Sequence, residues 1–234
     1  MADISQHILG GEVTSPKEFP WAVKIYACNQ WFCNEYGGTI ISESWVLTSA
    51  ECVDGYSEFT VLAGANDVYV PNPERVVLRS NKVVKHPGYS SSNFDNNIAL
   101  IELPSKLVFT DYIKPICLSA IGASVGDKAS IMGWGDVTGS GSPSAKLQVK
   151  HRLTIIQNSI ASGIYGSSIA ISQNQICTSG SGICYVSAFF VCLSCYLHKK
   201  KCFKKSFWMS WTKYWWIQSP YIEFTFFRVT WEVL

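Results

Sequence analysis

The chain has 234 residues, of which 47% are hydrophobic and 15% charged, enough for one large hydrophobic core or two small ones. Its formal net charge of +2 is too small to indicate a nucleic-acid partner. Nine cysteines are many for a reducing compartment and favour an extracellular location, and their odd number leaves at least one without an intrachain partner. The beginning, MADISQHILGG, has no basic region followed by an apolar stretch, so it does not predict a signal peptide.

The composition changes sharply near residue 183. Residues 1–182 carry 12 basic and 15 acidic residues, whereas residues 183–234 carry 7 and 2. All 17 glycines precede residue 183, and the last 52 residues contain no Gly, Asn or Asp, the residues on which tight turns rely. The chain is therefore predicted to contain two regions of different origin.

The first region begins with short runs rich in β-branched and aromatic residues. They recur from Pro20 to Leu103 at the spacing of strands in sandwiches and barrels, and turn formers separate them. The pattern predicts a first antiparallel β unit over about residues 20–105. The runs are WAVKIYA, GGTIISESWVLTSA, FTVLAGA, RVVLRSNKVVKH and NNIALIEL.

The segment PSKLVFTDYIKPICLSAIGASVGDK alternates little and contains two prolines, which suits a connection to a second β unit over about residues 126–182. The strands of that unit are predicted in KASIMGWG, KLQVKHRLTII and QNQICTSGSG. After it, residues 175–197 are uncharged and a basic cluster follows, a pattern that a membrane span could also give. The strongly apolar part, residues 183–197, is short for a span and favours a buried segment.

Several motifs resemble blocks of the chymotrypsin/trypsin-like serine proteases, in the order expected for that family. ILGGEVTSPKEFPWAV resembles the mature start of such enzymes, GGTIISESWVLTSAEC the block that normally ends in Ala-His-Cys, and DNNIALIEL the block built on Asp-Ile-Ala-Leu. YIKPICL, MGWG and QICTSGSG match further family segments. The resemblance covers residues 8–182 and is specific because the whole ordered set is present.

The resemblance implies an all-β fold, a double antiparallel β-barrel of the trypsin type, with an incomplete second barrel. It divides the chain into an activation-peptide remnant (1–7), a protease domain (8–182) and a tail outside the family (183–234). The tail holds five of the nine tryptophans and lacks the Gly-rich turns that the missing strands would need.

By resemblance, Glu51 occupies the position of the general-base histidine and Asn97 that of the buried orienting aspartate, and the nucleophile motif Gly-Asp-Ser-Gly-Gly is absent from the sequence. An imidazole with a pKa near 6.5 can accept and return the serine proton, whereas a carboxylate with a pKa near 4.3 is poorly suited to that cycle at neutral pH. Changing the aspartate to asparagine in such a triad reduces turnover by about 10⁴. Loss of the oxyanion donors reduces turnover by a further factor of about 10²–10³.

Other candidate residues have simpler interpretations. Ser181, between two glycines, fits a flexible loop upstream of the family's nucleophile, and His7, His86, His151 and His198 fit exposed histidines. Ile8 is the family's activation terminus, but the aspartate that would pair with the freed amine is missing.

The resemblance pairs Cys33 with Cys52, although three additional residues precede the glycine pair, and it leaves Cys177 to pair with Cys28, Cys117 or a tail thiol. One C-x-x-C in the tail is too little for a zinc site, so neither a metal nor a cofactor is expected.

Two main hypotheses follow, beside a membrane-anchored form and a chain that has no function because it does not fold stably. The first is a serine protease homologue with a degenerate triad that binds a protein or peptide without cleaving it; the second is a serine endopeptidase whose nucleophile-bearing C-terminus is missing from this sequence. No nucleic-acid partner is expected, and membrane attachment is expected only through residues 175–197. The family resemblance implies an extracellular location despite the absence of a signal peptide.

Overall fold

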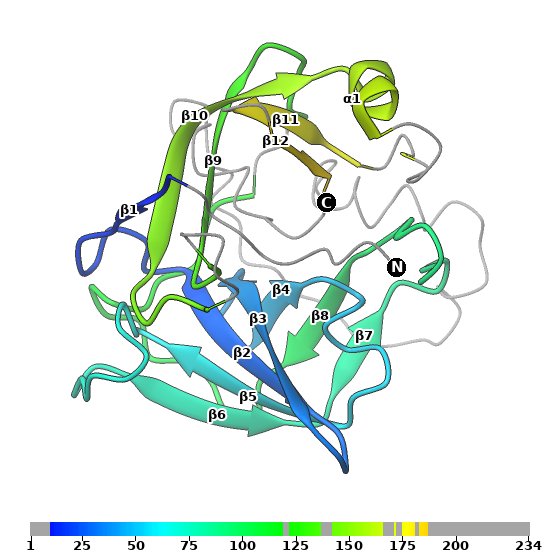
Figure 1. Cartoon of the computed structure of the whole chain (residues 1–234). Coiled ribbons are helices and arrows are strands. Elements are labelled where there is room, and N and C mark those ends of the chain that lie inside the picture. The colour runs from blue at the N-terminus through cyan, green and yellow to red at the C-terminus, as the bar shows by residue number, and fades with distance from the viewer. Residues whose placement is uncertain are drawn as a thin grey trace.

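The computed structural model describes residues 10–118, 122–136, 142–165, 171, 175–180 and 183–186. The described chain is mostly strand, with one helix, and Figure 1 shows one sheet in its lower half and a second sheet in its upper half. The all-β fold class is therefore confirmed. The elements are β1 (Glu12–Val13), β2 (Ala22–Cys28), β3 (Cys33–Ile40), β4 (Trp45–Thr48), β5 (Glu58–Ala63), β6 (Val76–Ser80), β7 (Val83–Lys85), β8 (Ala99–Glu102), β9 (Lys128–Gly133), β10 (Gln148–Ile156), α1 (Asn158–Tyr165), β11 (Cys177–Gly180) and β12 (Ile183–Val186).

The lower sheet has seven strands in the order β6-β5-β2-β3-β4-β8-β7. Its two outer strands, β6 and β7, are consecutive in the chain and are separated by Asn81 and Lys82 alone. The chain therefore leaves one edge of the sheet and immediately rejoins the other. The Ser80 hydroxyl donates to the Glu102 carbonyl at 2.6 Å, and the Glu102 amide donates to the Lys82 carbonyl at 3.0 Å. The first of these bonds joins β6, at one edge, to β8 beside the other edge, and the sheet curls into a barrel.

The barrel interior is filled by one cluster of apolar side chains from alternating strand positions, as the pleat of a half-buried strand requires. Gly38 on β3 shows how closely it is packed. A Cβ there would lie 2.7 Å from Ile25 Cδ1 and 2.8 Å from Val46 Cγ1. The largest fully buried members are Phe59, Ile25, Ile40, Ile101, Ile113, Val23, Val46 and Val61.

In the upper sheet β10 is central. It pairs with β9 along one side, whereas β1 and β11 share its other side, at Gln148–Val149 and at Thr154–Ile156 respectively. The register with β9 shifts between Lys150 and Leu153, where Arg152 has a φ of 62°. Such a bulge bends the strand and increases its twist. β12 pairs with β11 and consists of residues that the change in composition assigned to the tail.

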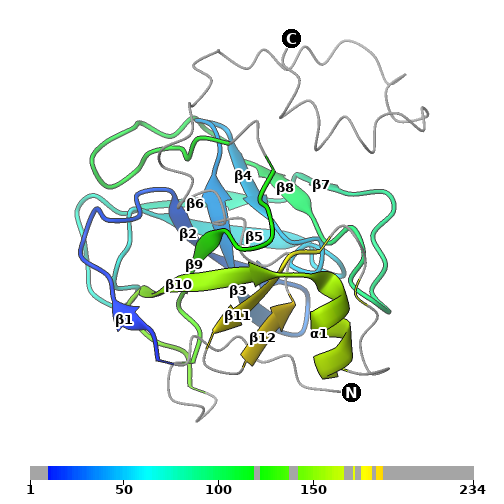
Figure 2. The same cartoon turned by 90° about the horizontal axis from the view of Figure 1, so that it is seen from above.

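The helix α1 was not among the predicted elements. It follows β10 directly, and it packs the buried Ala161 against Cys177, with Ile156 and Ile171 at the margin of that small cluster. Figure 2 shows α1 beside β11 and β12. The segment PSKLVFTDYIKPICLSAIGASVGDK contains no strand or helix within its described residues until β9 begins at Lys128, as a connection between two units would.

The two sheets share a third cluster, formed by Ala22 and Val68 from the first unit and Met132, Trp134, Leu147 and Val149 from the second. Trp134, from the MGWG motif, donates its indole N–H to the Asn66 carbonyl at 3.2 Å. The buried Lys24 of β2 places its ammonium 5.9 Å from the centre of the Trp134 ring and pairs with Glu35 at 2.7 Å. These contacts fix the second unit against the first.

Candidate active site

The register of two strands brings Glu51 and Asn97 together. β4 and β8 are antiparallel, with Thr48 opposite Ala99. The residues just after β4 and those just before β8 therefore meet at the same end of the barrel. Glu51 lies three residues after Thr48, in a tight turn where the Asp54 amide donates to the Ala50 carbonyl at 2.9 Å. Asn97 lies two residues before Ala99 and is 5% exposed.

Glu51 and Asn97 are joined by two hydrogen bonds, one from the Glu51 backbone and one between the side chains. The Glu51 backbone N–H donates to Asn97 Oδ1 at 3.0 Å, and Asn97 Nδ2 donates to Glu51 Oε1 at 2.8 Å. The first bond fixes the amide orientation, because the oxygen must face the backbone N–H and the NH₂ group must then face the carboxylate. Within the described part of the chain, no hydroxyl or imidazole hydrogen-bonds to Glu51.

Burial raises the pKa of Glu51 from 4.5 to about 7, although the hydrogen bond from Asn97 acts in the opposite direction. Desolvation penalises the charged carboxylate, and an N–H donor favours it. Burial thus moves the pKa of Glu51 away from the ordinary carboxylate value near 4.3, but it does not give the side chain the two-nitrogen geometry of an imidazole. An aspartate at position 97 would place a second carboxylate against Glu51, so Asn97 suits this glutamate in a way that the family's aspartate would not.

Tyr89 is a neighbour of the pair that the sequence did not indicate. Its pKa is raised to about 12, first by burial and then by the charges of Glu51 and Asp54. The Lys85 ammonium pairs with Asp54 and lies 5.8 Å from the centre of the Tyr89 ring. Tyr89 follows Pro87 and Gly88 in a turn where its amide donates to the His86 carbonyl, and such a turn predicts an exposed loop.

The other candidates do not join this pair. His86 accepts a hydrogen bond from the Gly88 amide at 3.1 Å, and His151 shares one with Ser130 at 2.8 Å in the second unit. Both histidines therefore have local roles. His7, Ile8, Ser181 and His198 lie outside the described residues.

The predicted Cys33–Cys52 disulfide is corrected by the structure. Cys33 is bonded to Cys28, its cross-strand partner in the β2–β3 hairpin, with the Cα atoms 4.1 Å apart. Three residues separate Cys33 from Gly37, so Cys33 lies about 13 Å from Gly37 along β3. The Thr48 hydroxyl, at the end of β4 that leads to Cys52, donates to the Gly37 carbonyl. Cys52 lies at that end, is fully buried as a free thiol, and burial raises its pKa to about 12. The alternative pairing of Cys28 with Cys177 is excluded as well.

Two further expectations concern metals and membranes. In the residues that the structure describes, no group of three or more His, Cys, Asp or Glu is arranged to hold a metal ion. The same residues include no helix with the length and apolar character needed to cross a membrane. Most of the segment 175–197 lies outside the described residues.

Comparison with known proteins identifies the class. The Trypsin family model matches residues 8–186, four residues beyond the predicted boundary. Trypsin alpha of Drosophila melanogaster is 30% identical over 183 residues, which are 78% of this chain and 70% of that protein, and trypsin delta of Drosophila erecta is 31% identical over 78% of this chain and 71% of that protein. The solved structure titled "Structure of GrC" superposes with a TM-score of 0.68 at 26% identity, over 74% of this chain and 76% of that one.

This chain belongs to the trypsin family. The match in sequence and the superposition in structure confirm the family resemblance and the trypsin-like double β-barrel. The roles of Glu51 and Asn97 as replacements of catalytic residues remain predictions from the aligned motifs.

Proposed function

We propose that this chain is a non-catalytic member of the trypsin family, which binds a protein or peptide ligand outside the cell as a decoy or scaffold. The observation that carries the proposal is the hydrogen-bonded Glu51–Asn97 pair, because the resemblance of the motifs assigns these two residues to the positions of the general-base histidine and its aspartate. A disulfide within the first barrel is consistent with an oxidising, extracellular location.

The raised pKa of Glu51 does not restore the catalytic cycle. A base with a pKa of about 7 is suited to accepting a proton at neutral pH. In the triad, however, the aspartate stabilises the protonated base that forms during the reaction. Asn97 does the opposite, because its N–H donation favours the unprotonated carboxylate of Glu51. The pair therefore stabilises the state before proton transfer and opposes the state after it.

The remaining catalytic parts support the same proposal. The printed sequence contains no Gly-Asp-Ser-Gly-Gly motif, which in this family supplies the nucleophile and the backbone donors for the oxyanion. Ser181, between two glycines, lacks the preceding aspartate of that motif.

The second candidate is a serine endopeptidase whose nucleophile-bearing segment is missing from this sequence. It is favoured by the relatives named trypsin, which match this chain over about 70% of their own length. Sequencing the transcript across the codons for residues 176–190, together with mass spectrometry of C-terminal peptides, distinguishes the two. A transcript that encodes the nucleophile motif after these codons would favour the endopeptidase.

A fluorophosphonate probe tests the proposal on the purified 234-residue chain. This reagent modifies a serine that a neighbouring base has activated, so we expect no labelling under conditions in which an active trypsin is labelled to completion. Peptide mapping by mass spectrometry identifies any modified residue. Labelling of a serine in the folded chain, abolished by heat denaturation, would contradict the non-catalytic assignment.

A further inference from the structure

The tip of the β2–β3 hairpin exposes two large aromatic side chains to solvent. Trp31 is 85% exposed and Phe32 is 53% exposed, and both lie between Cys28 and Cys33. Figure 1 shows the hairpin extending beyond the rest of the seven-stranded sheet. Tryptophan and phenylalanine are enriched in protein interfaces relative to the rest of the surface, so this exposed pair makes the tip a candidate binding site.

The tip is held in one conformation before any partner binds. The Asn29 side-chain carbonyl accepts hydrogen bonds from the backbone N–H groups of Trp31 at 2.9 Å and Phe32 at 3.1 Å. The backbone N–H of Asn29 donates to the backbone carbonyl of Phe32 at 3.0 Å. The Cys28–Cys33 disulfide closes the same loop. A partner would therefore not need to order this segment, which removes one of the main entropic costs of association.

The two aromatic rings differ in their surroundings. Phe32 packs edge-on against Tyr56, with ring centroids 6.0 Å apart, and Tyr56 in turn accepts a hydrogen bond from Asn34 at 2.6 Å. Trp31 contacts no other ring among the described residues. Phe32 therefore anchors the tip to the barrel, and the faces of the Trp31 indole are available for binding.

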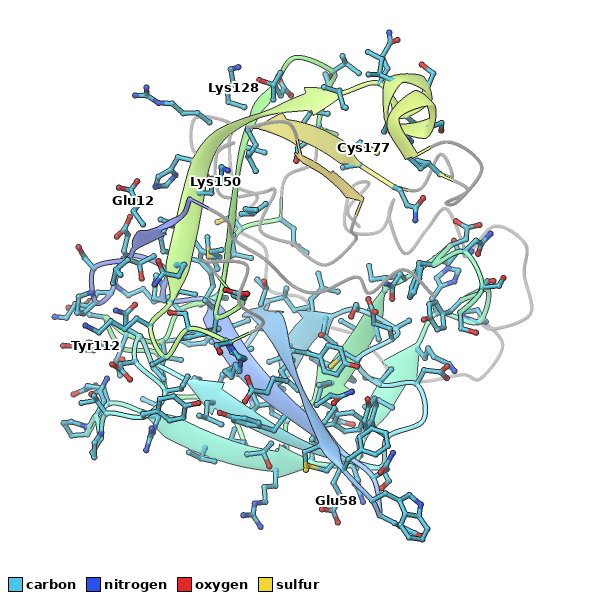
Figure 3. All side chains as sticks on the ribbon, in the orientation of Figure 1. Glu12, Glu58, Tyr112, Lys128, Lys150 and Cys177 are labelled. Carbon is cyan, nitrogen blue, oxygen red and sulfur yellow. A yellow bond between two sulfur atoms is a disulfide. The ribbon has the colours of Figure 1, made fainter. Side chains whose placement is uncertain are left out.

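The charge beside the tip is negative and only partly neutralised. Glu35 pairs with Lys24, and Asp54 pairs with Lys85. Glu58 is exposed, lies opposite Cys28 at the base of the tip, and has no ion-pair or hydrogen-bond partner for its carboxylate among the described residues. Figure 3 places Glu58 beside the end of the hairpin.

We propose that the disulfide-closed tip Cys28–Cys33 is a docking site for an arginine-bearing segment of a partner protein, with Trp31 stacking on an arginine guanidinium and Glu58 pairing with a cationic side chain of the same segment. Indole faces attract cations, and arginine combines stacking with bidentate pairing to carboxylates. The proposal rests on the binding function proposed above and names its surface. An anionic membrane is a poorer partner, because the unpaired carboxylate of Glu58 would be repelled by its surface.

The test measures binding of a fluorescein-labelled peptide in which glycine and arginine alternate, by fluorescence anisotropy with the full chain at low salt. Trp31→Ala should weaken binding between about twofold and thirtyfold, the range of a cation–π contact. Glu58→Gln should weaken it by about twofold to fivefold, and the difference should shrink as salt is added. Val108→Ala, which truncates a side chain that is 78% exposed in another loop, is the matched control and should leave binding unchanged.

Each outcome decides the proposal. Loss of affinity in Trp31→Ala and Glu58→Gln, but not in Val108→Ala, supports it, provided that a peptide of alternating glycine and glutamate does not bind. Failure of the arginine peptide to bind, or equal binding to Trp31→Ala, overturns it. Sedimentation with phosphatidylcholine vesicles that depends on Trp31, without peptide binding, would overturn it in favour of a membrane contact. Mass spectrometry of the recovered peptide detects any cleavage, so failure of the non-catalytic assignment is seen separately.

Discussion

The first barrel and the second unit differ in how their cores are built. The seven strands of the first barrel enclose a single cluster of buried apolar side chains. The five described strands of the second unit bury smaller clusters, one of them shared with the first barrel through Ala22 and Val68 and another centred on Ala161 and Cys177. The first barrel also holds Glu51 and Asn97. Neither residue belongs to the buried apolar cluster, so different side chains determine the packing of the first barrel and the chemistry of this pair.

The largest predicted effect contrasts the two cores. Phe59→Ala should lower the free energy of unfolding by about 3–5 kcal/mol, since Phe59 is fully buried in the first-barrel cluster. Leu153→Ala, equally buried but on β10 of the second unit, should cost less, toward the lower end of the range of about 2–5 kcal/mol for buried leucines. Urea denaturation followed by circular dichroism measures both. A larger loss for Leu153→Ala would mean that the second unit carries the stability, contrary to this comparison.

The next prediction concerns the pH dependence of stability that Glu51 contributes. The pKa of Glu51 is higher in the folded chain than its ordinary value, so between pH 4.5 and about 7 the folded state binds more protons than the unfolded state. Stability contributed by this group is therefore lost as pH rises through that window, up to about 3 kcal/mol.

Glu51→Gln keeps an acceptor for Asn97 and has no charge to bury. It should therefore unfold at a higher urea concentration than the parent chain at pH 8, and the difference should nearly vanish at pH 4.5. Glu12→Gln, at an exposed position in β1, is the control and should show no such pH dependence. Parallel pH profiles for the parent chain and Glu51→Gln would contradict a raised pKa at position 51.

A smaller effect is expected from the hairpin disulfide. Replacing both Cys28 and Cys33 by serine removes the constraint of a short loop, which is worth about 2 kcal/mol on a chain-entropy estimate. Thermal unfolding measures the change, and the parent chain after reduction should match the variant. If the loss instead approached that of Phe59→Ala, the hairpin would have to be part of the barrel core.

The smallest effect is expected for chemical labelling of Cys52. The thiol is fully buried and its pKa is raised to about 12, so at pH 7.5 it should not react with iodoacetamide in the native chain. Mass spectrometry of peptides before and after denaturation measures the modification. Complete labelling of Cys52 in the native chain would contradict the burial of this thiol in the first-barrel cluster.

Much of the fold follows from patterns that depend on local sequence. The run FTVLAGA corresponds to β5, RVVLRSNKVVKH to β6 and β7, and NNIALIEL to β8, because alternation of apolar residues and bounding turn formers are both local signals. The helix α1 was missed because NSIASGIY has neither acidic residues in its first turn nor basic residues in its last, the usual marks of helix ends. β12 was missed because the composition changes at residue 183, although its residues follow β11 almost directly and pair with it as a hairpin.

The candidate site was predicted only in part. Ordered motifs placed Glu51 and Asn97 together, and the structure does bring them into contact. The raised pKa of Glu51 could not be read from its neighbours in sequence, because burial is set by the assembled barrel. The disulfide prediction failed for a similar reason, since the register of the β2–β3 hairpin, rather than the family's usual pairing, decides which cysteine faces Cys33.

The proposal that this chain does not catalyse hydrolysis is tested most directly with a peptide ester. The parent chain and Glu51→Gln are compared at pH 8 after contaminating proteases have been removed. The Glu51–Asn97 pair opposes proton transfer, so both proteins are predicted to hydrolyse the ester no faster than buffer. Hydrolysis by the parent chain well above the buffer rate, and lost in Glu51→Gln, would contradict the claim.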